Sequence, residues 1–223
     1  ALLPAGFALG ALGVGAASLG LRADPAASDE PRTEGPVTGG GEIPGGPRSF
    51  VAVARRSPVL GPFLLGLFVV AAGAGAAASF LPLRILDTGG GPLLIGVASA
   101  LPALVEIPFF SASGRIAART GLRGLYAIGI SVSVAQFLAV AIAPSPLVIA
   151  AARTIDGAAY ALRYTAIVLV VGAALPERLR AMGQSVTWLV TGAIAPIVGG
   201  PVGGALYGLL GGPTFFIGSA ATI

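Results

Sequence analysis

Long apolar segments alternate with short polar ones along the whole chain. Six of the apolar segments contain 20 or more residues, and a shorter seventh one ends the sequence. A helix of about 20 apolar residues is long enough to cross the hydrocarbon core of a bilayer. The pattern therefore predicts an all-α, polytopic bundle of transmembrane helices. The segments cover residues 1–21, 59–83, 93–113, 124–143, 147–175, 182–210 and 213–223.

A long polar stretch separates the first two apolar segments. Residues 23–58 are rich in Pro, Gly and charges of both signs and contain too little apolar surface to form a core. We interpret them as a linker between one helix, residues 1–22, and a six-segment bundle, residues 59–223. The first segment lacks an initiator Met and a basic start, which favours a span within a longer protein over a secretory signal. The short last segment likewise suggests a truncated chain.

Composition supports the membrane interpretation and removes several kinds of chemistry. The chain is 55% hydrophobic and 10% charged, with a mean hydropathy of +0.92, whereas about 25% of residues in soluble domains are charged. It contains no Cys and no His, which excludes disulfides, Cys/His zinc sites and Ser/His triads. We therefore expect neither an enzyme nor a bound metal or cofactor. The net charge of +4 is modest, and nucleic acid is not an expected partner.

The distribution of arginine predicts the orientation. Short loops rich in basic residues tend to stay in the cytoplasm, and the predicted connections alternate between arginine-rich and arginine-poor. This places the linker, residues 23–58, in the cytoplasm, and we expect an integral protein of the bacterial cytoplasmic membrane. The arginine-rich connections hold Arg55 and Arg56, then Arg115, Arg119 and Arg123, then Arg178 and Arg180.

One predicted helix carries charges in its apolar run. At roughly 100° per residue, five polar side chains between residues 153 and 164 fall within an arc of about 100°. An ionised side chain at mid-helix costs at least about 2.5 to 3.5 kcal/mol, and such residues usually face a bundle interior or an aqueous cavity. This polar stripe is therefore a candidate site for substrate binding or coupling. It consists of Arg153, Asp156, Tyr160, Arg163 and Tyr164.

Two ion pairs are expected around this stripe. Arg153 and Asp156 are three residues apart, a spacing that allows an ion pair within one helix. Glu106 lies at a similar counted depth in its own segment, so we predict a pair between Glu106 and Arg163 across a cavity. Such pairs could instead simply hold two helices together. Pro102 and Pro108 flank Glu106 and allow that helix to bend.

Further candidates lie in the segment 182–210. Gln184 could hydrogen-bond a substrate and Trp188 could stack on it, although Trp is often an interfacial anchor. The same segment and residues 71–79 are rich in Gly and Ala, which lets helices approach closely. Static packing and sliding of smooth helix faces both fit this composition.

The stretch "GRIAARTGLR", residues 114–123, resembles the loop motif G-x-x-x-D-R-x-G-R-R of the major facilitator superfamily. Gly114, Arg119, Gly121 and Arg123 match this conformational motif, whereas Ala118 stands in place of its Asp. A gating salt bridge through that Asp cannot therefore be carried over. The resemblance implies the C-terminal half of the fold, with helices 6 to 11 and the start of helix 12.

Two further segments, "EIPFFSASGRIAARTG" and "PERLRAMGQS", resemble the group that includes lactose permease and the nucleoside or phenylpropionate proton symporters. In lactose permease a Glu of helix 8 recognises the sugar, and helix 10 carries a Lys-x-x-His-x-x-Glu pattern tied to proton coupling. Glu106 would match the first, while Arg153, Asp156 and Ala159 would fall on the second. Galactoside specificity is therefore not expected. In this superfamily the substrate site lies near the bilayer midplane.

The function expected is secondary active transport of a small solute by alternating access, in a protein that is a monomer when full length. If protons are coupled, Asp156 or Glu106 must carry them. One alternative is a transporter-like scaffold or sensor, and another is an integral membrane transferase, which would need clustered carboxylates. Unpaired, Arg153 and Arg163 would suit an anionic substrate; paired, they would suit a neutral one.

Overall fold

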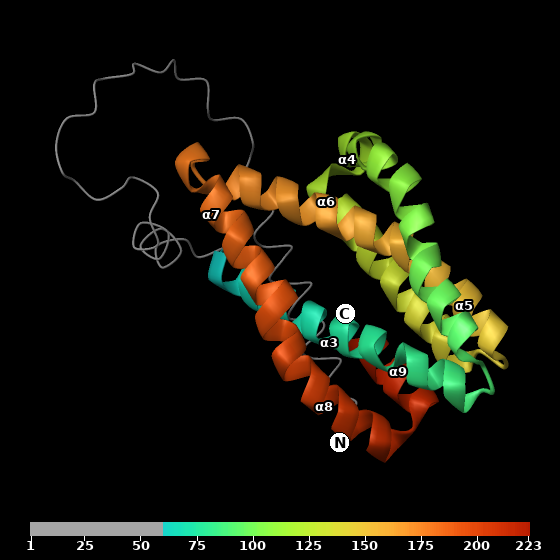
Figure 1. The fold of residues 1–223 in the computed structure, drawn as a ribbon. Coiled ribbons are helices and arrows are strands. Elements are labelled where there is room, and N and C mark those ends of the chain that lie inside the picture. The colour runs from blue at the N-terminus through green and yellow to red at the C-terminus, as the bar shows by residue number, and fades with distance from the viewer. Residues whose placement is uncertain (1–59) are drawn as a thin grey trace, which may run out of the picture.

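The computed structural model describes residues 60–223. The predicted first helix, residues 1–22, and the linker, residues 23–58, lie outside this part. Within it the chain is helical, without a strand (Figure 1), so the prediction of an all-α bundle is confirmed. The elements are α3 (Leu60–Asp87), α4 (Pro92–Ile142), α5 (Pro146–Thr154), α6 (Asp156–Ala174), α7 (Glu177–Trp188), the π-helix η1 (Leu189–Ile194), α8 (Ala195–Leu210) and α9 (Gly212–Thr222).

Helix α4 consists of two antiparallel arms. It contains 51 residues with non-helical backbone angles at Gly121, and Figure 1 shows that the chain reverses direction there. The two arms correspond to the predicted segments 93–113 and 124–143. The first arm, however, stays helical to Thr120, so most of the motif stretch 114–123 forms a helix end and the turn itself is confined to Gly121. The first arm also remains helical through both of its prolines.

Four helical stretches are long and apolar enough to cross a membrane, judged by length and composition. One of these stretches, α4, folds back at Gly121, and its two arms correspond to two of the five segments predicted for residues 59–210. Many large apolar side chains on these helices are exposed, as expected where a bundle meets lipid. The stretches are Leu60–Asp87, Pro92–Ile142, Pro146–Ala174 and Glu177–Leu210. Exposed examples include Leu65, Leu93, Leu104, Ile107, Ile142, Ile197 and Leu209.

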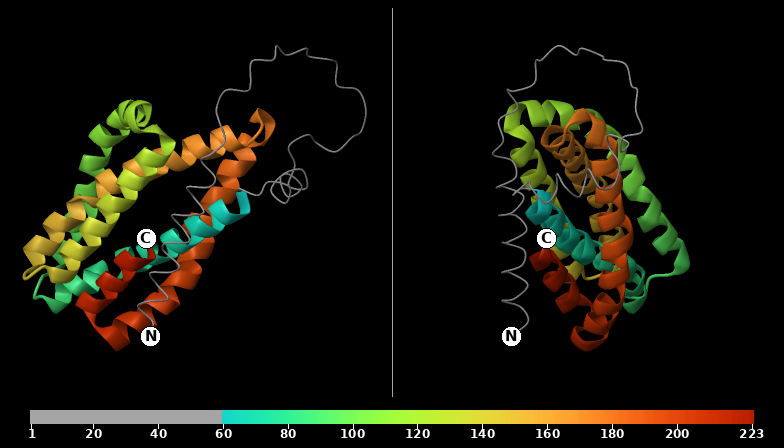
Figure 2. Two further views of the ribbon diagram at one scale, coloured as in Figure 1. Left: turned by 180° about the vertical axis from the view of Figure 1, so that it is seen from behind. Right: turned by 90° about the vertical axis from the view of Figure 1, so that its left-hand side faces the viewer.

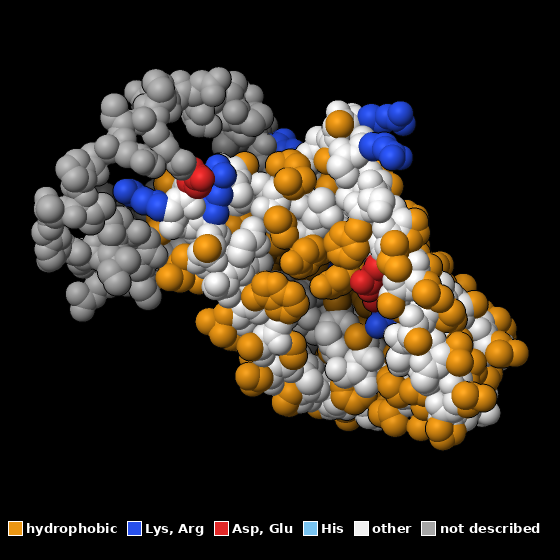
Figure 3. Space-filling view, turned by 45° about the horizontal axis from the view of Figure 1, so that its top comes forward, with side chains coloured by type: hydrophobic (Ala, Val, Ile, Leu, Met, Phe, Trp, Pro, Cys, Tyr) orange, Lys and Arg blue, Asp and Glu red, His pale blue; other side chains and the backbone are white. Residues whose placement is uncertain are grey.

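The arginine-rich turns gather at one end of the bundle. The reversal of α4 and the connection between α6 and α7 lie at the same end, opposite the turns that precede α4, α5 and α9 (Figure 2). Figure 3 shows basic side chains at these two tips and a largely apolar surface away from them. The two arginine-rich turns that the structure describes thus lie at one end, as predicted, whereas the connection with Arg55 and Arg56 lies outside the described residues.

Helix α6 packs between the two arms of α4 at positions that lack a side chain. A Cβ atom on Gly157 would lie 2.1 Å from the carbonyl oxygen of Pro102, in the first arm. A Cβ on Gly129, in the second arm, would lie 2.7 Å from Cγ of Arg163 and 3.2 Å from Cβ of Leu162. Each glycine therefore allows a backbone approach that any other residue would prevent.

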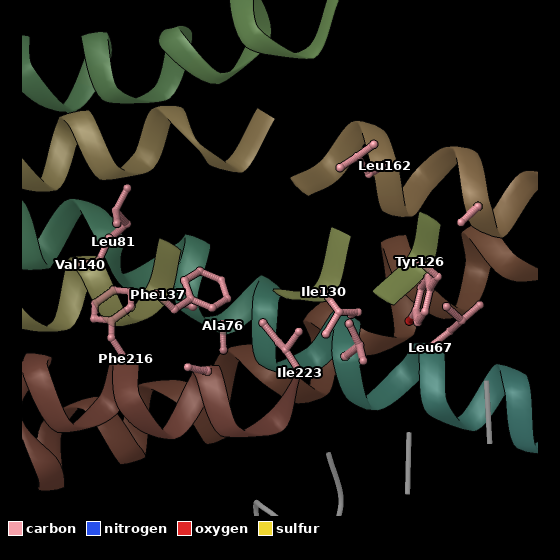
Figure 4. Close-up of a cluster of buried hydrophobic side chains, with 14 of the residues drawn as sticks. Leu67, Ala76, Leu81, Tyr126, Ile130, Phe137, Val140, Leu162, Phe216 and Ile223 are labelled. Atoms are coloured by element: carbon pink, nitrogen blue, oxygen red, sulfur yellow. The ribbon is translucent and has the colours of Figure 1, made fainter. Parts of the chain in front are cut away.

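Helices α3, α8 and α9 complete the core. Phe216 of α9 contacts Phe137 of α4, with ring centroids 6.4 Å apart, and both belong to the buried cluster in Figure 4. Helix α8 packs on α3 through Gly199 and Gly203, whose Cβ atoms would lie 2.6 Å from the carbonyl oxygen of Ala72 and 2.7 Å from Cβ of Ala76. These contacts support static packing as one role of the small residues.

Adjacent glycines of α8 allow a matched test of this packing. Gly199→Ala should lower the free energy of unfolding by about 1 to 3 kcal/mol because the new methyl group would overlap the α3 backbone. Gly200→Ala should be neutral or stabilising by up to about 1 kcal/mol, because nothing lies within 4 Å of its Cβ position. Thermal unfolding of the purified protein in detergent compares the two. Equal melting temperatures would contradict close α3–α8 packing.

The reversal of α4 depends on glycine for a different reason. Gly121 has φ 71° and ψ 173°, a region in which residues other than glycine are strained by about 1 to 3 kcal/mol, although nothing lies within 4 Å of its Cβ position. Gly121→Ala should therefore lower the melting temperature. Gly114→Ala serves as control, since Gly114 is helical and equally open. Parallel melting curves for the two variants would show that the turn has another conformation.

Candidate functional site

A cavity of about 320 Å³ lies between α3, α6 and the α7–η1 segment. Its volume is at the lower end of the range for small-molecule sites, about 300 to 1,000 Å³. Figure 3 shows acidic and basic side chains beside a hollow on a face that is otherwise largely apolar. The lining comprises Leu67, Val70, Ala71, Ala74, Gly75 and Ala78 of α3, Tyr126 of α4, Asp156, Tyr160, Arg163, Tyr164, Ile167 and Val168 of α6, Gln184, Thr187 and Trp188 of α7, and Thr191 and Gly192 of η1.

The polar stripe forms one wall of this cavity. Four of its five members line the cavity, because positions 156, 160, 163 and 164 share one face of α6. Tyr160 is the middle residue of the membrane-spanning stretch Pro146–Ala174. The fifth member, Arg153, lies outside the lining. The structure thus brings together most of the side chains that the helical wheel had placed on one face.

The ion pair predicted within the stripe is formed. Arg153 and Asp156 contact each other through Nη1 and Oδ2, and their side chains are 18% and 19% exposed. The pair spans a break of one residue in the α-helical hydrogen bonding, between the end of α5 at Thr154 and the start of α6 at Asp156, although Ile155 keeps helical backbone angles. At the break, the N–H of Ile155 donates to the carbonyl of Ala152 at 3.2 Å, an i to i+3 bond of the 3₁₀ type. The pair therefore joins α5 to α6.

The predicted pair between Glu106 and Arg163 is wrong. No ion pair joins them, and Glu106 is not part of the cavity lining. Glu106 is level with Gly157, whose Cβ would lie 3.1 Å from the Glu106 backbone nitrogen. Arg163 is six residues further along α6, or about 9 Å. Counting residues from the segment ends could not detect this offset, which is set by the packing of α6 on α4.

Arg163 is the basic residue of the cavity lining. Its stem passes over Gly129, which leaves room for it. The ionisable groups that interact with it electrostatically are Asp156, Tyr126, Tyr160 and Arg153. Since Asp156 is already paired with Arg153, the cavity presents Arg163 as a cation without an ion-pair partner among the described residues.

An aromatic cluster extends the polar stripe. The rings of Tyr160 and Tyr164 stack with centroids 5.7 Å apart, and Trp188 contacts Tyr164 at 6.4 Å. Phe110 meets both tyrosines edge-on, at 6.3 and 5.9 Å. Sequence reasoning missed Phe110, although it lies four residues after Glu106 and so on the same helix face. The cluster links α4, α6 and α7.

The candidate residues of α7 take different positions. Gln184 donates its side-chain N–H to the carbonyl of Val168 at 3.1 Å and thereby ties α7 to α6. Trp188 lines the cavity and is 53% exposed. Thr187 and Thr191 were missed, but they continue the i, i+3, i+4, i+7 spacing begun by Gln184 and could have been found by it. The hydroxyl group of each donates to the carbonyl four residues earlier in the same span.

The motif residues lie away from the cavity. Gly114, Arg119, Gly121 and Arg123 are exposed at the end of the bundle where α4 reverses. Their conformational role stays a prediction. Among residues 60–223, no group of three or more acidic residues could hold a metal ion.

A family model described as "MFS_1 like family" matches residues 11–217. No curated protein matches the chain. The match covers far more than half of the sequence and agrees with the helical bundle and its apolar spans. The chain therefore belongs to the MFS_1 like family, within the major facilitator superfamily, and is a transporter-type integral membrane protein.

Proposed function

We propose that the protein is a secondary active transporter that moves a small solute by alternating access and that the cavity is its part of the substrate site. The observation that supports this most strongly is the polar wall of the cavity at the middle of a membrane span. Asp156, Tyr160 and Arg163 line it together. Charged groups in hydrocarbon are costly, and those found there usually pair with one another or line a substrate or ion pathway.

The simplest structural explanation is that paired charges hold two helices together, and it accounts for only part of this arrangement. The Arg153–Asp156 pair joins α5 and α6, which belong to one membrane-spanning stretch. It therefore does not hold neighbouring spans of the bundle together. Nor does a pair between Glu106 and Arg163 do so. A purely structural role would leave the position of Arg163 and two tyrosines in the cavity unexplained.

The break at Ile155 offers a place for movement. A 3₁₀ turn within a helix often marks a hinge, and here the Arg153–Asp156 pair closes over it. In the proposed cycle this pair opens and re-forms as the spans rock. If the protein couples protons, Asp156 is the better candidate than Glu106, because it lines the cavity and its protonation would release Arg153.

The lining also bears on substrate class. Arg153 is paired while Arg163 has no ion-pair partner among the described residues. This favours the anionic of the two substrate classes that the sequence left open. We also propose kinship to the group of lactose permease and the nucleoside or phenylpropionate symporters, on the basis of the two segments that resemble it. The proposal further includes a monomeric state and a cytoplasmic linker.

The test uses the intact protein in proteoliposomes, with a solute first identified by thermal shift across a panel of small organic acids, nucleosides and sugars. Asp156→Asn should reduce uptake by at least about tenfold, because Arg153 is left unpaired at a cost of a few kcal/mol. Glu106→Gln should have a smaller effect, because Glu106 lies outside the cavity lining.

A double variant separates transport chemistry from stability. Arg153→Gln with Asp156→Asn removes both charges and should restore the melting temperature while uptake stays low. Wild-type uptake in this double variant would reduce the pair to a structural role. Unchanged, proton-dependent uptake in both single variants would remove Asp156 and Glu106 from the mechanism.

One alternative function has a distinct outcome. A transporter-like scaffold or sensor would show the thermal shift with a solute but no accumulation of that solute in vesicles. An integral membrane transferase finds less support, since the described carboxylates form no metal-binding cluster.

A further inference from the structure

The indole ring of Trp188 lies directly on the backbone of Gly192. A Cβ atom added to Gly192 would lie 2.8 Å from Cε3 and 3.1 Å from Cζ3 of Trp188. Both of these atoms belong to the six-membered ring of the indole. Any side chain at position 192 would therefore displace the ring. Both residues line the cavity.

The backbone beneath the ring is unusual. Trp188 ends α7 and the π-helix η1 begins at the next residue. The N–H of Ala195 donates to the carbonyl of Val190. This i to i+5 bond closes a wide turn that contains Gly192. Pro196 has no N–H to donate to the carbonyl of Gly192, four residues before it. Such π-helical turns occur frequently at functional sites.

The other neighbour of the indole is Tyr164. Their ring centroids are 6.4 Å apart at an interplanar angle of 61°, and Tyr164 itself stacks on Tyr160. The indole thus lies between a bare backbone on η1 and the aromatic cluster of α6. If the indole ring were displaced from Gly192, it could move only toward its exposed sides. One of these sides faces the cavity.

We propose that Trp188, held on the bare backbone of Gly192, sets the size limit for molecules that enter the cavity. Gly192 is then a specificity-determining position for the solute, and the indole is the movable side chain that it positions. The inference rests on the proposed function for the identity of the cavity as a solute site. The size limit itself can be measured without transport.

The absence of Cys from the 223 residues provides a direct probe. Gly75 lines the cavity from α3, and nothing lies within 4 Å of its Cβ position. In a Gly75→Cys variant of the intact protein, with any Cys elsewhere replaced by Ala, labelling rates are measured with N-methylmaleimide and with the bulky N-pyrenylmaleimide. The labelling rate of the bulky reagent divided by that of the small reagent reports the size of the entrance to the cavity.

Gly192→Ala in this background should lower the ratio about tenfold, since overpacking by one methyl group displaces a rigid ring. Adding Trp188→Phe, which removes the ring atoms that would overlap the methyl group, should restore the ratio. This double-mutant cycle assigns the effect to the contact between the two residues. Gly200→Ala, on the same span with open space at its Cβ position, should leave the ratio unchanged.

Trp188→Ala provides a second measurement that does not depend on adding a side chain at position 192. It should raise the ratio, because the indole is removed altogether. An unchanged ratio in both Gly192→Ala and Trp188→Ala would overturn the size limit. A ratio that stays low when Trp188→Phe is added would assign the effect of Gly192→Ala to the π-helical backbone and would also overturn it.

These outcomes are independent of transport. If the ratios change as expected but no solute accumulates in vesicles, the size limit stands and the transporter proposal fails. If solute accumulates with unchanged ratios, the transporter proposal stands and the role of Gly192 fails.

Discussion

The contact between α6 and the first arm of α4 is the constraint on which the candidate site depends. At Gly157 the α6 backbone touches the carbonyl of Pro102, so closely that a single methyl group could not be placed between them. Gly129 allows a similar approach on the other side of α6. These two contacts fix the rotation of α6. The face that carries Asp156, Tyr160 and Arg163 consequently turns toward α3 and α7, where the cavity lies.

The same contact determines which charges meet. It places Glu106 beside Gly157, and Glu106 there interacts electrostatically with Tyr160. Arg163 is left within the cavity, with its stem passing over Gly129. Asp156 is held by Arg153 across the break in the span. The charges of α6 therefore act mainly along their own span, and a solute entering the cavity would meet Arg163 and the aromatic cluster.

Much of this arrangement follows from short-range patterns in the sequence. The apolar runs predicted the spans from residue 59 to 210, and helical spacing alone placed Asp156 and Arg163 on one face. The pair between Arg153 and Asp156 also depends on spacing within a few residues. Distances between helices do not follow from such patterns, because they depend on where glycines let two backbones meet.

The features that the sequence did not predict have two origins, the register between helices and local departures from regular helix. The Glu106–Arg163 pair failed because depth was counted from segment ends, whereas Gly157 sets the register. The break at Ile155 and the π-helix after Trp188 are local departures from regular helix that no apolar period reveals. The reversal of α4 was placed too broadly, because helix 92–120 continues through most of the motif before Gly121 ends it.

The cavity has two walls of contrasting character. Helix α6 supplies its charged side chains, Asp156 and Arg163, whereas the facing part of α3 presents Ala71, Ala74, Gly75 and Ala78. If the cavity is a solute site as proposed, α6 would supply charge recognition, whereas the small residues of α3, together with Trp188 of α7, would limit the volume available. Exchanging alanines on α3 would therefore change the volume of the cavity without disturbing the electrostatics of the opposite wall.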